Sequence, residues 1–146
     1  MILPIQTNQD NPILRQKAKE VKEISPQIKG LISDMIETLK ANQGIGLAAP
    51  QIGQLLHVIV AKPESDKEAL VLINPQIKKT SRKKEIIEEG CLSLPNISAP
   101  VERPIKITVQ GLDADGQSVK IKAKGLLARI IQHEIDHLSG ILIVDK

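Results

Sequence analysis

No phenylalanine, tyrosine or tryptophan occurs in the 146 residues of this chain. A hydrophobic core must therefore be filled by isoleucine, leucine, valine and smaller apolar residues, without the large flat side chains that supply much of the buried area in most domains. Hydrophobic residues make up 41% of the chain and charged residues 25%, so a soluble globular fold is still expected. The length suits one domain with its own core and is short for two. We therefore expect residues 1–146 to form a single domain.

Several features bear on where the protein works. The chain contains no apolar run of membrane-spanning length, and its first residues, MILPIQTNQDNP, lack the basic and apolar segments of a secretory signal. Cys91 is the only cysteine and has no partner for an internal disulfide, which is typical of a reducing compartment. These features predict a cytoplasmic protein that does not enter a membrane.

The charge pattern gives a weaker indication of partners. The net charge is +3, and basic residues are concentrated only in KKTSRKKE, residues 78–85. Such a run is usually a solvated face, here expected to lie on a hairpin, although it could also touch a phosphate backbone. Nucleic acid is therefore a secondary partner in this interpretation.

The clearest helix signal starts at Ser25, after which apolar residues recur at the spacing of one helical face. We expect Ser25 to be the N-cap, Pro26 the first helical residue and Gly44 the stop. LLHVIVA and ALVLINP, residues 55–61 and 69–75, are short runs rich in β-branched residues and are expected to be strands.

Towards the C-terminus, residues 105–124 alternate in polarity on both sides of Asp115-Gly116, which predicts a hairpin. GLLARIIQHEIDHLSG, residues 125–140, carries a broad apolar stripe and predicts a last helix that ends at Gly140. The expected fold is thus α+β, with mixed or antiparallel sheets around a helix near the C-terminus.

That last helix contains the motif H-E-x-x-H. On a helix, His133 and His137 lie one turn apart and can direct their imidazoles to one metal ion, while Glu134 between them can take and return a proton. The motif alone also occurs by chance, because a histidine on an apolar face is often only a hydrogen-bonded core residue. A catalytic site needs a third protein ligand and one open position.

The third ligand is expected from upstream. Only nine residues follow His137, and Asp145 among them is too close to the chain end to be convincing. Cys91, in EEGCLSLP, is the natural candidate, because a thiolate is the softest ligand that the chain offers to a divalent metal. The alternative for a lone cysteine is an inert buried residue.

Three segments together resemble the signature motifs of the peptide deformylases: GIGLAAPQ (44–51), EGCLSLP (89–95) and QHEIDHLSG (132–140). The opening segment PILRQKAKEV, residues 12–21, is similar to the start of that family as well. The resemblance implies hydrolytic removal of the formyl group from the N-terminal formylmethionine of nascent polypeptides, with release of formate. It also implies one metal ion, ferrous iron in cells with zinc, nickel or cobalt accepted, held by Cys91, His133 and His137.

The resemblance assigns further roles. Glu134 would be the general base and acid, and the Gln51 amide and the Leu92 N–H would donate to the oxyanion. An apolar slot for the methionine side chain would be lined by Ile45, Gly46, Ile87, Gly90, Leu126 and part of Arg129.

Other polar residues near the motifs are expected to support the site. Glu89 and Arg103 would form an ion pair behind it, with a surface pair as the competing interpretation. Asp136 is expected to support structure rather than bind metal, and His57 to be a surface or core histidine.

The chain ends six residues after Gly140, so the C-terminal helix with which some family members dock on the ribosome is expected to be missing. Any ribosome contact would then be transient, and we expect a monomer. Two other functions stay open at this stage. One is a peptidase or other amidohydrolase with the same metal site, and the other is a non-catalytic metal-binding or RNA-binding module. Retention of Glu134, Gln51 and Cys91 argues against the module, because a structural site needs no base.

Overall fold

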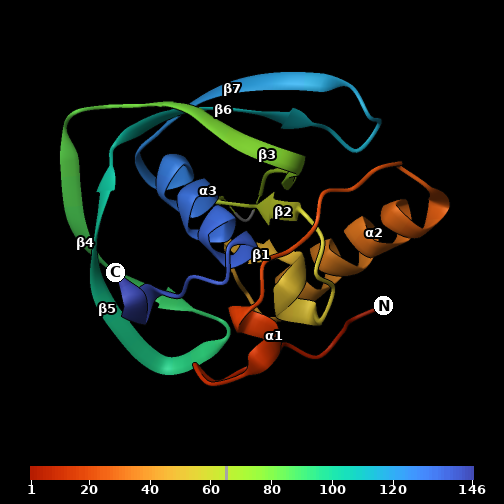
Figure 1. Ribbon diagram of the computed structural model, residues 1–146, viewed down its shortest axis with the longest axis horizontal. Helices are drawn as coiled ribbons and strands as arrows, with labels where there is room; N and C mark the ends of the chain where they lie inside the picture. Colours follow the sequence, from red (N-terminus) through yellow and green to blue (C-terminus); the bar gives the residue numbers. More distant parts are fainter. Residues whose placement is uncertain (65) are drawn as a thin grey trace.

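The computed structural model describes residues 1–64 and 66–146 and has an α+β fold built on two antiparallel sheets (Figure 1). The larger sheet has the strand order β1-β2-β3-β6-β7, and the smaller one pairs β4 with β5. The strands are β1 (Gly46–Ala48), β2 (Val58–Ala61), β3 (Leu70–Thr80), β4 (Lys84–Cys91), β5 (Leu94–Pro104), β6 (Lys106–Leu112) and β7 (Ser118–Lys124). The helices are α1 (Pro12–Arg15), α2 (Pro26–Ala41) and α3 (Gly125–Leu138), with 3-10 turns η1 (Ala49–Ile52) and η2 (Ile143–Asp145). The predicted fold class is confirmed.

Helix α2 begins where the sequence predicts, because the Ser25 hydroxyl caps its first turn. It ends at Ala41, earlier than the predicted stop at Gly44. The end is a Schellman closure, in which the Gly44 N–H donates to the Leu39 carbonyl and Gln43 adopts φ +54°. Glutamine therefore takes the left-handed position that sequence reasoning gives to glycine.

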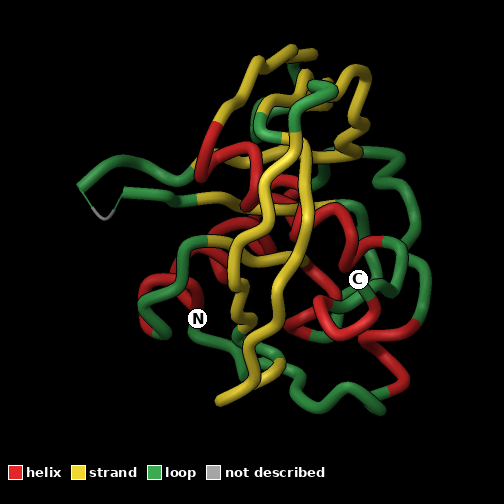
Figure 2. Tube along the Cα trace, turned by 90° about the vertical axis from the view of Figure 1, so that its left-hand side faces the viewer, coloured by secondary structure: helices red, strands yellow, loops and turns green. Residues whose placement is uncertain are grey.

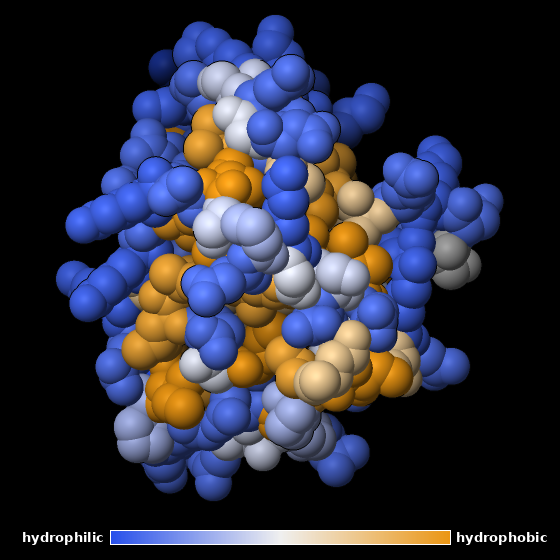
Figure 3. Space-filling view, turned by 90° about the vertical axis from the view of Figure 1, so that its right-hand side faces the viewer, coloured by the Kyte–Doolittle hydropathy of each residue, from blue (hydrophilic) through white to orange (hydrophobic). Residues whose placement is uncertain are grey.

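Strand β2 is buried on both faces. Val58 and Val60 pack in a core cluster with α2, whereas Ile59 and Ala61 pack in a second cluster with α3. Because side chains alternate along a strand, the two helices cover opposite faces of the sheet at this point. A third, smaller cluster joins α1, β5 and η2. On the side where α2 lies, apolar residues also reach the surface between polar side chains (Figure 3).

The two predicted hairpins have different outcomes. β6 and β7 pair along their whole length, and Gly116 adopts φ +84° in the turn, which confirms the hairpin at Asp115-Gly116. The hairpin predicted for residues 78–85 is wrong. β3 pairs with β6 while β4 pairs with β5, so this basic run leads from one sheet into the other. The long β4–β5 pair faces the viewer in Figure 2 and runs down the length of the molecule.

The N-terminal segment packs against the end of α3. The Ala18 N–H donates to the Leu138 carbonyl at 2.9 Å. Ser139 is the C-cap and Gly140 follows it with φ +75°, so α3 ends where the sequence predicts. A Cβ at Gly140 would overlap the carbonyl oxygen of Arg15. Glycine is therefore required there both by the backbone conformation and by the close approach of the N-terminal segment.

Candidate active site

Three side chains able to bind a metal meet where α3 passes the end of β4. His133 and His137 direct their Nε2 atoms to within 3.3 Å of each other. Cys91, the last residue of β4, places its Sγ 3.4 Å from His137 Nε2. One ligand atom from each residue lies within 4.8 Å of the others. The fold thus brings together the three residues that the sequence predicts as ligands.

The spacing of these atoms fits a tetrahedral metal centre. With metal–nitrogen bonds of about 2.0–2.1 Å, two imidazole nitrogens lie about 3.3–3.4 Å apart, and a thiolate sulfur at about 2.3 Å lies about 3.6 Å from each of them. The corresponding distances here are 3.3 Å between the nitrogens and 3.4 Å from sulfur to His137. Three protein donors leave a fourth position for water or substrate, which is typical of a catalytic rather than a structural site.

Glu89 organises the polar groups behind the ligands. Its carboxylate accepts from His133 Nδ1 at 2.9 Å, from Arg103 at 2.7 and 3.0 Å, and from Arg129 at 2.5 Å. Burial alone would raise the pKa of Glu89, but the hydrogen bonds from His133 and Arg103 lower this pKa to about 2. The bond to Nδ1 fixes the orientation of the His133 ring and leaves Nε2 for the metal. The Glu89–Arg103 pair is buried, so the surface alternative is wrong.

The two histidines differ in their affinity for a proton. Burial and the charge of His133 lower the pKa of His137 to about 3, so His137 is a neutral imidazole, the form that binds metals. Burial acts in the same direction at His133, but the Glu134 charge and hydrogen bonds with Cys91 and Glu89 raise its pKa to about 10. The negative groups that attract a proton to His133 also attract a metal cation to the same nitrogen.

Glu134 lies beside the ligands with little access to solvent. Its exposed fraction is 4%, and Oε1 has no hydrogen-bond partner among the described residues. Burial raises the pKa of Glu134 to about 7, against the opposing charge of His133. A carboxylate in such a setting can both accept and return a proton near neutral pH. Gly46 in β1 packs directly against it, since a Cβ at Gly46 would lie 2.5 Å from Glu134 Oε2.

Two further predicted residues flank Cys91. Gln51, in η1, is buried, and its Oε1 accepts from the Ala48 N–H at 2.9 Å. Its Nε2 donates to Ser93 Oγ at 3.0 Å and lies 3.5 Å from Cys91 Sγ. These contacts hold the donor end of the amide beside Cys91, one of the three candidate metal ligands. Leu92 lies in the short turn that joins β4 to β5, immediately after Cys91.

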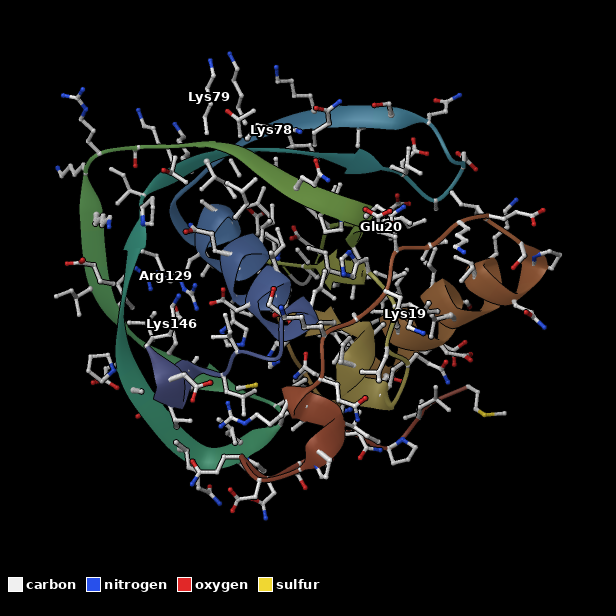
Figure 4. All side chains as sticks on the ribbon, in the orientation of Figure 1. Lys19, Glu20, Lys78, Lys79, Arg129 and Lys146 are labelled. Carbon is white, nitrogen blue, oxygen red and sulfur yellow. The ribbon has the colours of Figure 1, made fainter. Side chains whose placement is uncertain are left out.

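A cavity of about 1130 Å³ opens beside these groups. All six residues predicted for the methionine slot line it: Ile45, Gly46, Ile87, Gly90, Leu126 and Arg129. Leu126 is 51% exposed, so the alternative that it is a plain core residue is wrong. Arg129 lies between α3 and the β4–β5 pair (Figure 4), and its guanidinium is held by Glu89 and by the carbonyls of Val101 and Glu85. Its role in ordering the site is therefore larger than the sequence indicates.

The remaining polar candidates are not ligands in this arrangement. Asp136 accepts from Arg103 at 2.8 Å, as a supporting residue would. His57 lies 3.1 Å from the Ala18 carbonyl, and Asp145 pairs with Arg15. None of the three belongs to the ligand cluster found among the described residues.

Sequence reasoning missed three residues of the site. Ser93 holds the Gln51 amide, and Ile97 and Ile130 complete the apolar wall of the cavity. Ile130 precedes His133 by three positions, so helical spacing could have identified it. Ser93 lies two residues after Cys91 within EGCLSLP, so its motif could have identified it, whereas Ile97 carries no local signal because only the β4–β5 pairing brings it to the site.

No helix among the described residues has the length and apolar character needed to cross a bilayer.

Comparisons with known proteins agree with this geometry. Residues 2–146 match the family model of polypeptide deformylase. A peptide deformylase of Dictyoglomus thermophilum is 49% identical over 136 residues, which cover 93% of this chain and 87% of the relative. The crystal structure of peptide deformylase from Thermotoga maritima superimposes with a TM-score of 0.94 and 38% identity, covering 100% of this chain and 97% of that one. The crystal structure of a peptide deformylase from Legionella pneumophila superimposes with a TM-score of 0.94 and 41% sequence identity. The match covers 99% of this chain and 85% of that chain.

Proposed function

This chain belongs to the polypeptide deformylase family, and on that premise we propose which of its residues carry each part of the reaction. The protein is a metal-dependent hydrolase that removes the N-formyl group from the N-terminal formylmethionine of nascent polypeptides and releases formate. One observation carries the assignment of residues: Cys91, His133 and His137 converge beside the buried carboxylate of Glu134.

Cys91, His133 and His137 hold one divalent metal ion, which when bound polarises the formyl carbonyl as a Lewis acid. The working ion in cells is ferrous iron, with zinc, nickel or cobalt accepted after purification. The affinity of nitrogen and sulfur ligands for divalent metals rises from iron to cobalt and nickel and is also higher for zinc. The ion that copurifies with the protein therefore need not be the ion that it uses in cells.

Glu134 takes a proton from the attacking water, whose oxygen bonds to the formyl carbon. The Gln51 amide and the Leu92 N–H donate to the oxyanion that forms on the carbonyl oxygen. Glu134 then passes the proton to the departing nitrogen as the carbon–nitrogen bond breaks, which gives formate and a free amino terminus. The unpartnered Oε1 of Glu134 and its burial support this double role.

The six slot residues, Ile45, Gly46, Ile87, Gly90, Leu126 and the aliphatic part of Arg129, receive the methionine side chain. The substrate backbone lies in extended form along the open edge of β1, which is the end strand of its sheet. The Ile45 carbonyl accepts a hydrogen bond of 2.6 Å from the N–H of Lys62, the residue that follows β2. This carbonyl therefore points towards β2. Because a trans peptide points its C=O and N–H in opposite directions, the Gly46 N–H faces the open edge.

The enzyme acts as a monomer in the cytoplasm, where its contact with the ribosome is transient. All proposed site residues come from one chain, and its single cysteine serves as a metal ligand, a role that requires a reduced thiol.

The test is anaerobic reconstitution with ferrous iron, and separately with nickel and zinc, followed by formate release from formyl-Met-Ala-Ser. Cys91→Ala should lose both metal and activity. Glu134→Gln, which keeps the shape of the side chain, should keep the metal and lose activity by at least 10²-fold, on the order of one general acid–base catalyst. His57→Ala is the matched control and should behave as the wild type. A Glu134→Gln variant that is metal-loaded and fully active would refute the assigned base.

A further inference from the structure

The outward face of β3, β6 and β7 carries several basic side chains and no acidic ones. These three strands contain no aspartate or glutamate at all. They carry six exposed lysines, the connection after β3 adds two exposed basic residues, and the first residue of β4 adds one more: Lys78, Lys79, Lys106, Lys120, Lys122, Lys124, Arg82, Lys83 and Lys84. The side chain of the labelled Lys79 is directed away from the body of the molecule (Figure 4). We call these nine residues the basic face.

The basic face concentrates the charge of the whole chain. It holds nine of the 20 basic residues, which leaves 11 for the rest of the chain against 17 carboxylates. The rest of the chain is therefore acidic, although the net charge is only +3. Within residues 1–64 and 66–146, no member of the basic face forms an ion pair with a carboxylate. Its positive charges are thus not paired directly with carboxylates of the described residues.

The strand register places like charges side by side. Lys106 lies directly opposite Lys124, and Lys79 and Lys122 flank Thr108 in one row across the sheet. Like charges opposite each other destabilise a sheet, so this arrangement costs stability that a bound polyanion would restore. Lysines on an edge strand also prevent aggregation, and this role accounts for the lysines of the edge strand β7. Protection of an edge does not account for Lys106, because β6 is paired on both sides.

We infer that the basic face binds the phosphate backbone of RNA. Every second residue of a strand faces the same way, about 6.8 Å apart, and neighbouring strands are about 4.8 Å apart, so the lysines form a grid of point charges. An anionic bilayer would also attract such a grid, but stable membrane attachment needs apolar anchors as well. Among the described residues of β3, β6 and β7, the one large apolar side chain that is exposed is Ile77, at 36%; Ile86, at 63%, lies on β4. A phosphate backbone therefore fits this face better than a lipid surface.

The basic face reaches the mouth of the substrate cavity. Lys106 and Lys124 belong to the basic face and also line the cavity. RNA bound here would lie next to the entrance for the peptide. If the proposed function holds, the substrate is a nascent chain attached to a ribosome, and an RNA contact beside the cavity keeps the enzyme close to it. RNA binding itself does not depend on the metal or on Glu134.

The experiment compares two triple variants that change the net charge equally. Lys79→Gln with Lys120→Gln and Lys122→Gln removes three charges from the basic face but none from the cavity lining. Lys17→Gln with Lys22→Gln and Lys29→Gln removes three exposed charges elsewhere. Binding to a short labelled RNA duplex is measured by fluorescence anisotropy over a range of KCl concentrations. Formate release and far-UV circular dichroism, measured for each protein, report folding separately from RNA binding.

The expected result is a difference in salt dependence. With six phosphate contacts, wild-type affinity should fall about 2,000-fold between about 50 and 200 mM salt, and with three contacts about 40-fold. The basic-face triple should show the smaller fall and weaker binding at low salt, while the control triple matches the wild type. The proposal would be overturned if both folded triple variants lost RNA affinity equally, or if the wild type did not bind the RNA. Displacement of the RNA by anionic vesicles at the same phosphate concentration would overturn it as well. Failure of formate release with normal RNA binding would count against the proposed function alone.

Discussion

Gly46→Ala should inactivate the enzyme while leaving the fold intact. A Cβ at this position would lie 2.5 Å from Glu134 Oε2, 3.1 Å from its Cδ and 2.7 Å from Ile130 Cγ2. Ordinary carbon–oxygen contacts are about 3.3–3.6 Å, so the carboxylate must move by roughly 1 Å. The backbone of Gly46 does not require glycine, because its φ is not in the left-handed region. The effect is therefore steric and falls on the proposed catalytic base.

The size of the effect follows from that displacement. A misplacement of about 1 Å in a catalytic group costs about 10²-fold in rate, or about 2.7 kcal/mol of transition-state stabilisation. Overpacking against Ile130 should also destabilise the fold by about 1–3 kcal/mol. We expect kcat to fall by about 10²-fold, with metal content near that of the wild type because no ligand is touched.

The assay is formate release from formyl-Met-Ala-Ser with matched metal content, alongside thermal unfolding followed by far-UV circular dichroism. Gly30→Ala is the control, because Gly30 lies exposed within α2 and a Cβ there meets nothing within 4 Å. It should raise stability by about 0.5–1 kcal/mol and leave kcat unchanged. A folded, metal-loaded Gly46→Ala protein with kcat within threefold of wild type would refute the steric argument.

Three further predictions concern stability, each measured by urea denaturation. The pKa of Glu89 is lowered from 4.5 to about 2, so its contribution is complete above pH 4.5 and is lost as the pH falls towards 2. That loss is on the order of 3 kcal/mol, and Glu89→Gln should flatten this part of the pH profile. Gly140→Ala should cost more than about 2 kcal/mol, because it combines a positive φ with overlap of the Arg15 carbonyl. Ser25→Ala should cost about 1 kcal/mol through loss of the α2 cap, whereas Ser118→Ala should have little effect if capping is the cause.

Local features of the fold were predictable because they depend on near neighbours. The cap of α2 at Ser25, the turn at Gly116 and the end of α3 at Gly140 are each set by residue types within a few positions. The end of α2 shows the limit of such reasoning. Gln43 rather than Gly44 takes the left-handed conformation, and no rule of residue preference favours that choice.

The pairing of strands was not predictable in the same way. Residues 78–85 are expected from the sequence to be a solvated face of a hairpin, yet β3 pairs with β6 and β4 with β5. The choice of pairing partner depends on the apolar surface that the two sheets and their covering helices bury together. A local sequence pattern does not report that buried surface, so it does not predict the partner strand.

The sequence by itself indicated the candidate ligands and the candidate base of the site. Helical periodicity places His133 and His137 on one face with Glu134 beside them, and a single cysteine leaves one soft ligand to complete the set. Only the tertiary structure decided how these groups are held. Glu89 contacts His133, Arg103 and Arg129, and Gln51 is fixed through Ser93, all across long stretches of chain. Such contacts form only when sheets and helices are packed, because burial is what gives a hydrogen bond or ion pair its directing strength.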